Sequence, residues 1–398
     1  MFEPFPGNYV WNLSVNLALA MGGSIGEITE ANKPVMDAAL NGADEGTAAF
    51  FESWCGLADR LVELAREDEK NGHPLTASER MRRACVYYMT AERMQKHGYA
   101  PREEAYAKML AAMLESARLG NRNVEAVEIA YEGSSYPGFF VKAPDRDGKP
   151  APCMIHTNGL DSVKEMIYWS GIGDDLAARG ISTLMIDHPG VGEALRLRGL
   201  PGIFDSERWA SAAVDYLQTR DDVDPEAIGI MGWSLGGYYA PRAAAFEPRI
   251  KQCVSWGANH FWGELQKRRL MREGENPVPH YWEHVMWVFD QPDMDSFMAW
   301  APNMSLNGVV SRIAVPYLVT HGANDRQIPI EAAHMSYDQA TASPKRELHI
   351  FTHENGGVEH VSADNIAPSK WYIADWIAET FAELDAAKLN TAELGAAA

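Results

Sequence analysis

Basic residues are scarce in this sequence relative to acidic ones. Its 398 residues include 35 Lys and Arg against 55 Asp and Glu, and the formal net charge at pH 7 is −20. A protein that binds the phosphate backbone of nucleic acid needs a basic surface, so we do not expect nucleic acid as a partner. The acidic charge by itself indicates only a soluble chain that does not favour polyanions.

Long apolar runs are also missing. The apolar patch at 17–21 is too short and too interrupted to span a bilayer. Residues 1–6 lack the basic segment that opens a signal peptide. We therefore expect a cytoplasmic protein that binds no membrane and has no segment to be cleaved.

Cysteine is rare and follows no pattern. The chain has four cysteines, none in a CxxC or other metal-type spacing. We expect buried free thiols at Cys55, Cys85, Cys153 and Cys253. No spacing of histidines is typical of a metal site either, so we expect no metal.

The first 122 residues are predicted to form an all-helical domain, because apolar residues recur there at helical spacing. The clearest stripe consists of Phe50, Trp54, Leu57, Leu61 and Ala65. Two further stripes run over 81–89 and 106–114. We interpret these stripes as core-facing surfaces of helices.

From residue 123 onward, strand patterns and helix patterns alternate. Strands are expected at 124–129, 139–141, 151–156, 181–186, 227–231, 250–255, 314–319 and 346–351. Helices are expected at 164–179, 206–219, 238–246 and 368–384, and a turn at 136–138. This alternation predicts an α/β domain over 123–398, with a mostly parallel sheet covered by helices on both faces. The alternation stops over 256–312, which we interpret as a lid insertion.

The segment Gly232-Trp233-Ser234-Leu235-Gly236-Gly237 lies between an expected strand and an expected helix. A serine at the apex of such a strand–turn–helix is typical of a nucleophile elbow. The glycines at 232 and 236 let the strand and the helix approach each other closely. We predict that Ser234 is a nucleophile and that the backbone N–H of Leu235 is one donor of an oxyanion hole.

A serine nucleophile needs a base, and the base needs a group that holds its tautomer. Asp325 and His360 follow later strands at the sheet edge where Ser234 lies, so we predict a catalytic triad of these three. Two alternatives are that Asp325 only caps a turn and that His353 is the base. We favour His360 because two adjacent glycines let its loop fold back over the serine.

The second oxyanion donor is expected from the loop after the strand at 151–156. We choose the backbone N–H of Leu160, with Gly159 allowing a close approach. Each such donor typically lowers the barrier by roughly 3 kcal/mol.

With these residues placed, the chain resembles the α/β-hydrolase superfamily. Residues 187–192 are similar to the Asp-x-Pro-Gly-x-Gly loop common in that superfamily. Segments at 158–165, 232–237, 247–257 and 357–360 resemble one of its branches. That branch contains 2,6-dihydroxypseudooxynicotine hydrolase, fungal polyketide chain-shortening hydrolases and the fermentation-respiration switch protein.

The resemblance implies a helical cap domain at 1–122 over the site, a homodimer, and hydrolysis of a carbon–carbon bond beside a ketone. It carries the triad over as Ser234, Asp325 and His360. It also suggests that an acidic residue of the insertion assists, for which Glu264 is the candidate. His260 and Trp262 are its neighbours and further candidate substrate contacts. The alternative for Glu264 is a solvated helix carboxylate.

The first hypothesis is a cofactor-free serine hydrolase that cleaves a 1,3-diketone or aryl ketone, a small molecule of the polyketide or aromatic-catabolite kind. The tryptophan-rich insertion suits a flat apolar substrate, although simple packing explains it equally well. The second is a carboxylesterase that uses the same triad on small-molecule esters. The third is a hydrolase-fold protein that binds a partner without catalysis. A peptidase is disfavoured because the N-terminal domain is helical and lacks propeller repeats.

Overall fold

The computed structural model describes residues 1–145 and 148–396, with side chains as far as residue 387. The chain divides into two compact units. The helical unit comprises Met1–Val124, Leu265–Ala301 and Ala363–Asn365. The sheet unit comprises Glu125–Glu264, Pro302–Ser362 and the chain from Ile366 onward. The predicted lid insertion at 256–312 is thus shared between the two units.

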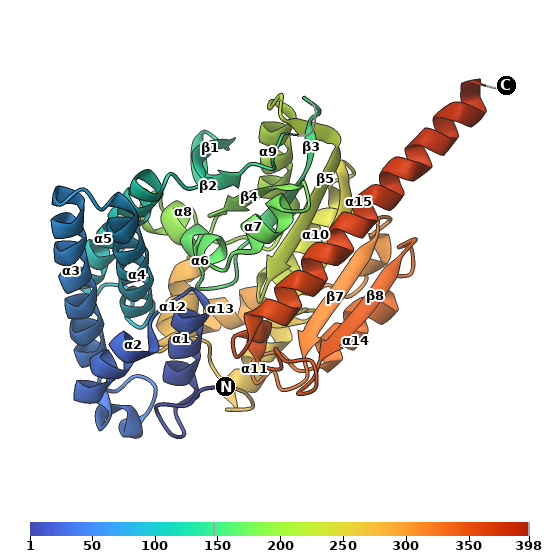
Figure 1. Cartoon of the computed structure of the whole chain (residues 1–398). Coiled ribbons are helices and arrows are strands. Elements are labelled where there is room, and N and C mark those ends of the chain that lie inside the picture. The colour runs from blue at the N-terminus through green and yellow to red at the C-terminus, as the bar shows by residue number, and fades with distance from the viewer. Residues whose placement is uncertain (146–147, 397–398) are drawn as a thin grey trace. The chain divides into compact units, whose positions relative to one another are not determined.

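The helical unit is built around one long helix. This central helix packs against the helices before and after it in the chain (Figure 1). The helices of the unit are α1 (Tyr9–Ala20), α2 (Ile25–Asn32), α3 (Thr47–Lys70), α4 (Pro74–Arg93), α5 (Ala100–Gly120), α12 (Tyr281–Val288) and α13 (Met294–Trp300). Helix α4 is the central one, and most of its second half is buried because α3 and α5 cover it. Helix α3 buries its predicted apolar stripe, including Phe50, Trp54 and Leu61.

The sheet unit contains one eight-stranded sheet in the order β1-β2-β4-β3-β5-β6-β7-β8. The strands are β1 (Glu125–Tyr131), β2 (Ser134–Val141), β3 (Ala151–Thr157), β4 (Ser182–Ile186), β5 (Val223–Trp233), β6 (Ile250–Trp256), β7 (Tyr317–Gly322) and β8 (Arg346–Phe351). Strands β1 and β2 pair antiparallel, as do β2 and β4, and all later pairs are parallel. The prediction of an α/β-hydrolase fold with a mostly parallel sheet is confirmed.

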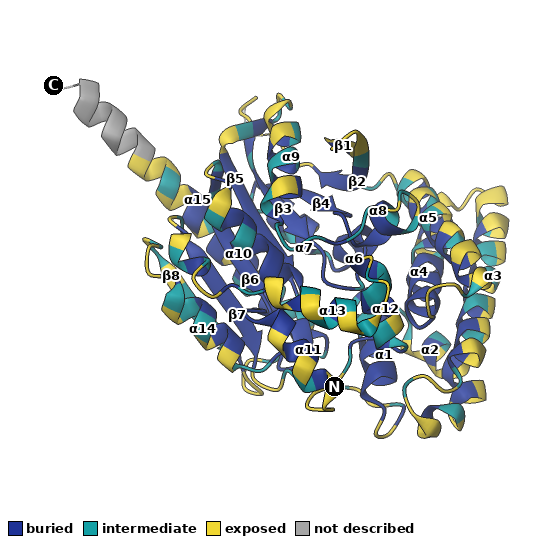
Figure 2. Ribbon diagram, turned by 180° about the vertical axis from the view of Figure 1, so that it is seen from behind, coloured by how far each residue is buried: buried dark blue, intermediate teal, exposed yellow. Residues whose placement is uncertain are grey.

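Helices cover this sheet, so its central strands are buried along most of their length, as Figure 2 shows in dark blue. The helices of the unit are α6 (Lys164–Trp169), α7 (Ile172–Ala177), α8 (Gly192–Arg196), α9 (Glu207–Gln218), α10 (Gly236–Phe246), α14 (Glu331–Gln339) and α15 (Ile366–Ala396), while α11 (Trp262–Leu270) crosses the boundary between the units. Helices α9 and α10 pack on each other and on β5, whereas α15 packs on α7 and β6. Strands buried on both faces have near-continuous apolar sequences, which is why they were predictable.

Two local predictions were wrong. The first hairpin turns at Glu132 and Gly133, not at 136–138, since both residues have positive φ (46° and 78°), which suits a tight two-residue hairpin. Pro137 instead lies inside β2 opposite Glu128. The expected helix at 164–179 is split into α6 and α7, because Gly171 adopts a φ of 79° between them.

Among the residues that the structure describes, no helix combines the length and the apolar character needed to cross a membrane.

Candidate active site

The turn between β5 and α10 places Ser234 at a sharp apex. Ser234 has a φ of 57°, and its N–H donates to the carbonyl of Trp256 at 2.9 Å. A positive φ is uncommon for a non-glycine residue and is the strained conformation of a nucleophile elbow. A Cβ on Gly232 would lie 2.5 Å from the carbonyl oxygen of Gly236. Only a glycine at 232 therefore allows the strand and the helix to pass this closely.

Ser234, His360 and Asp325 form a continuous hydrogen-bonded chain. The Nε2 atom of His360 lies 2.8 Å from the Oγ of Ser234, and its Nδ1 lies 2.8 Å from the Oδ2 of Asp325. Asp325 follows β7, and His360 follows β8, so both come from the carboxyl ends of parallel strands. His353, the alternative base, is exposed and is not part of this chain of hydrogen bonds.

The carboxylate of Asp325 is buried, and both of its oxygens have hydrogen-bond partners. Its Oδ1 accepts hydrogen bonds from the backbone N–H of Gln327 at 2.8 Å and of Ile328 at 3.0 Å. Burial by itself raises the pKa of Asp325, but the charge and hydrogen bond of His360, with help from His321, hold that pKa below its ordinary value. Asp325 is therefore an anion that can orient the imidazole and stabilise it when it is protonated.

The loops that carry Asp325 and His360 are locked together. The N–H of Asn324 donates to the carbonyl of Val358 at 2.8 Å, and its side-chain amide donates to Glu359 at 2.8 Å. A Cβ on Gly322 would lie 2.3 Å from the carbonyl of Val358, so the two loops approach at van der Waals distance. This contact fixes Asp325 and His360 relative to each other.

The backbone just after His360 is strained. Val361 and Ser362 have φ values of 45° and 60°, and a β-branched residue rarely adopts such a conformation. Strain of this kind persists where the surrounding structure holds a residue in place, and it is common at functional sites. The side chain of Val361 lies beside Gly257, which itself packs next to Ser234.

The two predicted oxyanion donors lie on segments that adjoin Ser234. Leu235 precedes the first turn of α10, where backbone N–H groups have no acceptor within the helix. On the other side, a Cβ on Gly159 would lie 3.0 Å from the Cβ of Ser234. The loop that carries Leu160 therefore passes directly over Ser234, and Leu160 itself is buried.

The predicted substrate contacts in the insertion lie in different surroundings. His260 is fully buried, and its two ring nitrogens lie 3.0 Å from the hydroxyl of Ser336 and 3.1 Å from the side-chain oxygen of Asn307. Trp262 is also buried, whereas Glu264 is exposed in the first turn of α11. A role for these three residues in binding a substrate stays a prediction.

The tryptophans of the insertion that belong to the helical unit have aromatic and cationic partners there. Trp287 stacks on His97 with ring centres 4.4 Å apart, and the guanidinium of Arg102 lies 5.1 Å from the centre of the same ring. Trp300 packs against Phe289 at 4.5 Å. These contacts are those of aromatic packing within one unit.

Lys164 and three acidic residues form a buried charge cluster to which the sequence analysis gave no role. Lys164 is 2% exposed, and its Nζ lies 2.7 Å from Glu165 and 3.2 Å from Asp187, with Glu193 as a third partner. Asp187 also accepts from the backbone N–H of Lys164 at 2.7 Å. All four residues lie in or beside the segments 158–165 and 187–192. The resemblance of these segments to known motifs was the sequence signal that could have drawn attention to the cluster.

In the described ranges, no group of His, Cys, Asp and Glu side chains is arranged to hold a metal ion.

Glu165→Gln is expected to stabilise the protein more at pH 8 than at pH 5. Burial raises the pKa of the Glu165 carboxyl from 4.5 to about 7, although Lys164 opposes this shift. Between pH 4.5 and pH 7 the carboxyl of Glu165 is ionised in the unfolded chain but still protonated in the folded chain. The contribution to stability is therefore complete below pH 4.5 and is lost as the pH rises through 7. Glutamine cannot ionise and escapes this loss.

Urea unfolding of both proteins at pH 5 and pH 8 measures the effect. Ser170→Ala is a matched control because it removes a buried hydroxyl from the adjoining segment without a change of charge. Its shift in unfolding free energy should be the same at both pH values. An equal shift for Glu165→Gln at the two pH values would contradict the prediction.

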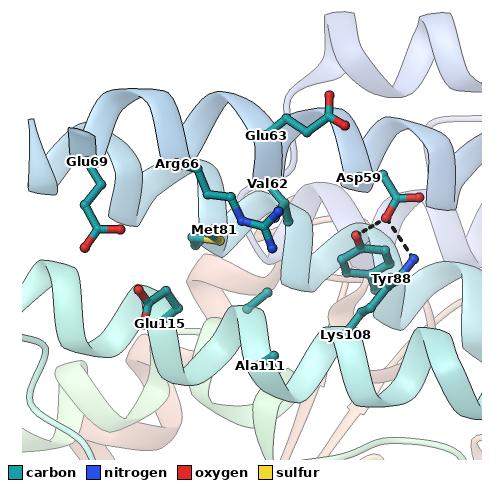
Figure 3. Close-up of a pocket in the computed structure, with 11 residues that line it drawn as sticks. Asp59, Val62, Glu63, Arg66, Glu69, Met81, Tyr88, Lys108, Ala111 and Glu115 are labelled. Carbon is teal, nitrogen blue, oxygen red and sulfur yellow. Dashed lines mark hydrogen bonds and ion pairs between the residues drawn. The ribbon is translucent and has the colours of Figure 1, made fainter. Parts of the chain in front are cut away.

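The helical unit carries a cavity of its own. It has a volume of about 620 Å³ and lies between α3 and α5, with α4 at its base (Figure 3). Asp59 lies at one end of this cavity, where its carboxylate accepts hydrogen bonds from the hydroxyl of Tyr88 at 2.5 Å and from Lys108 at 3.1 Å. Arg66 and Glu63 also line it. None of the three residues of the Ser234 chain contributes to this cavity.

The fold and the elbow geometry place the chain among the α/β-hydrolases, and the protein is a hydrolase. A family model described as "Esterase FrsA-like" matches residues 54–272, which is more than half of the chain. The chain therefore belongs to the FrsA-like esterase family. A model of the prolyl oligopeptidase family also matches residues 210–383.

Individual relatives agree with this assignment. The chain is 29% identical over 335 residues to "2,6-dihydropseudooxynicotine hydrolase" of Paenarthrobacter nicotinovorans, which covers 82% of this chain and 83% of the relative. It is 27% identical over 380 residues to "20-hydroxy-prefusarin hydrolase FUS2" of Gibberella moniliformis, covering 85% and 89%. The crystal structure of 2,6-dihydroxy-pseudo-oxynicotine hydrolase superposes with a TM-score of 0.75 at 24% identity, covering 92% of this chain and 95% of that one. That superposition supports the fold.

Proposed function

We propose that the protein is a serine hydrolase in which Ser234 is the nucleophile, His360 the general base and Asp325 the residue that orients the histidine. One observation carries the proposal. The Oγ of Ser234, the imidazole of His360 and the carboxylate of Asp325 are joined by two hydrogen bonds of 2.8 Å. A hydroxyl, an imidazole and a buried carboxylate in this order are the arrangement that activates a serine.

In the proposed mechanism, His360 takes the hydroxyl proton as the Oγ of Ser234 adds to a carbonyl carbon of the substrate. The resulting oxyanion accepts hydrogen bonds from the N–H groups of Leu235 and Leu160. The neighbouring carbon–carbon bond then breaks, and its electron pair leaves on a carbon whose carbonyl or aromatic ring delocalises the charge. His360 returns the proton to that carbon. In the last step, water hydrolyses the acyl-serine. In an alternative route no acyl-serine forms, because His360 activates a water molecule that attacks the substrate carbonyl in place of Ser234.

We propose a small ketone as the substrate, of the 1,3-diketone or aryl-ketone type. The names of the two relatives support this choice, because each is a hydrolase named for a small organic molecule and matches this chain over more than four fifths of its own length. The residues on either side of Ser234, Trp233 and Leu235, are buried and apolar, which favours a small apolar molecule over a polar chain.

A paired comparison of substrates tests this proposal. Purified protein would be assayed with p-nitrophenyl esters of short and medium acyl chains and with aromatic 1,3-diketones such as 1-phenylbutane-1,3-dione. Mass spectrometry would identify the two fragments from the diketones. The expected result is a higher kcat/KM for the diketones, with one acid and one ketone fragment. Turnover of the esters alone would overturn the assignment of carbon–carbon cleavage.

Carboxylesterase activity is the second candidate. It is favoured by a specific observation, namely that the family to which the chain belongs is described as an esterase family. The same three residues and the same two N–H donors would serve an ester, with an alcohol as the leaving group in place of a carbanion. The ester arm of the comparison measures this activity directly.

A further inference from the structure

Ser162 is a buried serine in the loop between β3 and α6, and its hydroxyl makes three hydrogen bonds. It accepts from the backbone N–H of Gly159 at 2.8 Å and from the indole N–H of Trp233 at 3.0 Å. It donates to the side-chain oxygen of Asn158 at 2.7 Å. A hydroxyl has one donor and two acceptor positions, so this group is completely used. Ser162 therefore has no capacity left to bind a substrate.

These three bonds join two segments that are separate in the sequence. Asn158 and Gly159 belong to the loop that passes over Ser234, and Trp233 is the residue directly before Ser234. One hydroxyl thus connects the loop of the second oxyanion donor to the nucleophile elbow. The N–H of Gly159 is committed to this bridge, and the donor proposed for this loop is the N–H of the next residue, Leu160.

The same loop is held on its opposite side by the end of β4. The side-chain amide of Asn158 donates to the carbonyl of Ile186 at 2.8 Å and to Asp187 at 3.2 Å. Asp187 is in turn held by the buried Lys164. The loop is therefore anchored to β4 through Asn158 and tied to β5 through Ser162, and the second tie sets its position relative to Ser234.

We propose that Ser162 is a positioning residue for the oxyanion hole. Its hydroxyl sets the separation between the Leu160 N–H and the Oγ of Ser234. The inference rests on the proposed function, because it presupposes that Ser234 is the nucleophile. Removal of the hydroxyl leaves three buried polar groups without this partner, and the loop shifts to satisfy them. A displacement of about 1 Å in such a site lowers the rate by roughly a hundredfold.

The test is the rate at which a fluorophosphonate probe labels the enzyme, since this reaction needs the serine and the oxyanion hole but no knowledge of the substrate. We expect Ser162→Ala to be labelled about 10 to 100 times more slowly than the wild type. Ser170→Ala, which also removes a buried hydroxyl, should be labelled within about twofold of the wild-type rate, because this hydroxyl donates to Ile167 and accepts from Ile172, both in its own segment.

Two further measurements separate positioning from a general loss of structure. With any ester that the enzyme turns over, Ser162→Ala should lower kcat while KM changes less than about threefold, because the interaction is made in the transition state. Ser162→Cys keeps the volume of the side chain and replaces the hydroxyl by a weak thiol, so it should also be labelled at least about fivefold more slowly. This variant serves as the test if Ser162→Ala does not fold.

The outcomes distinguish this inference from the proposed function. If the wild type is not labelled, or if Ser234→Ala is labelled equally, the proposed function fails and the inference with it. If the wild type is labelled, Ser234→Ala is not, and a folded Ser162→Ala or Ser162→Cys reacts at the wild-type rate, only the positioning role of Ser162 is overturned.

Discussion

Replacing Ser234 by alanine is expected to lower kcat by about a millionfold, to the residual rate that binding and the oxyanion donors alone provide. Without the Oγ of Ser234, the hydrogen bond to His360 has no donor and no acyl-serine can form. The measurement is steady-state turnover of the best substrate from the ester and diketone comparison. Mass spectrometry of the quenched protein should show an acyl adduct in the wild type and none in the variant.

Ser206→Ala is the matched control for this experiment. Ser206 is a fully buried serine of the same sheet unit, and its hydroxyl donates to the carbonyl of Tyr239 at 2.8 Å. Its loss should lower stability by about 1 kcal/mol and leave kcat within about twofold of the wild type. If Ser234→Ala retained full activity, the proposed catalytic triad would be wrong. That result would favour a hydrolase-fold protein that works by binding a partner.

Asp325→Asn is expected to lower kcat by about ten-thousandfold. The carboxylate of Asp325 accepts a hydrogen bond from the Nδ1–H of His360, which leaves Nε2 free to take the proton of Ser234. An asparagine amide at this position would donate to Nδ1 and so favour the tautomer in which Nε2 already carries the proton. The nucleophile would then have no base, although the side chain has the same shape.

The matched control for Asp325→Asn is Asp293→Asn. Asp293 caps α13 by accepting from the N–H of Ser296 at 2.7 Å, and asparagine caps a helix about as well. This control should keep both stability and turnover. A loss of activity smaller than about tenfold in Asp325→Asn would show that Asp325 does not orient the base.

Asp325 also affects stability, with a definite sign. Its pKa is lower in the fold than the ordinary value of 3.8, mainly through His360 acting against burial. Its contribution to stability is therefore present above pH 3.8 and is lost as the pH falls through the folded pKa. Glu165 has the opposite sign and acts at higher pH, so stability is lost through Asp325 below pH 3.8 and through Glu165 above pH 4.5.

Local sequence patterns were sufficient for much of the fold. The central strands are apolar on both faces, so their runs could be recognised without knowledge of their neighbours. The elbow around Ser234 was recognisable because it requires glycines at 232 and 236 within one short segment. The hairpin was misplaced because Pro137-Gly138 is a strong turn signal, whereas the pairing of β2 with both β1 and β4 keeps these residues in a strand.

The sequence by itself determined the number and order of the strands, the elbow, and the short set of residues from which a site could be built. These features depend on neighbours in the chain and on the periodicity of side chains. Only the tertiary structure decided that His360 and not His353 meets Ser234, that Ser162 bridges the loop of Leu160 to Trp233, and that Lys164 is surrounded by acids. Except for the pair Lys164 and Glu165, which are adjacent in the chain, these contacts join residues between 23 and 126 positions apart. Sheet register and loop packing settle such contacts, and the sequence pattern of either segment alone does not.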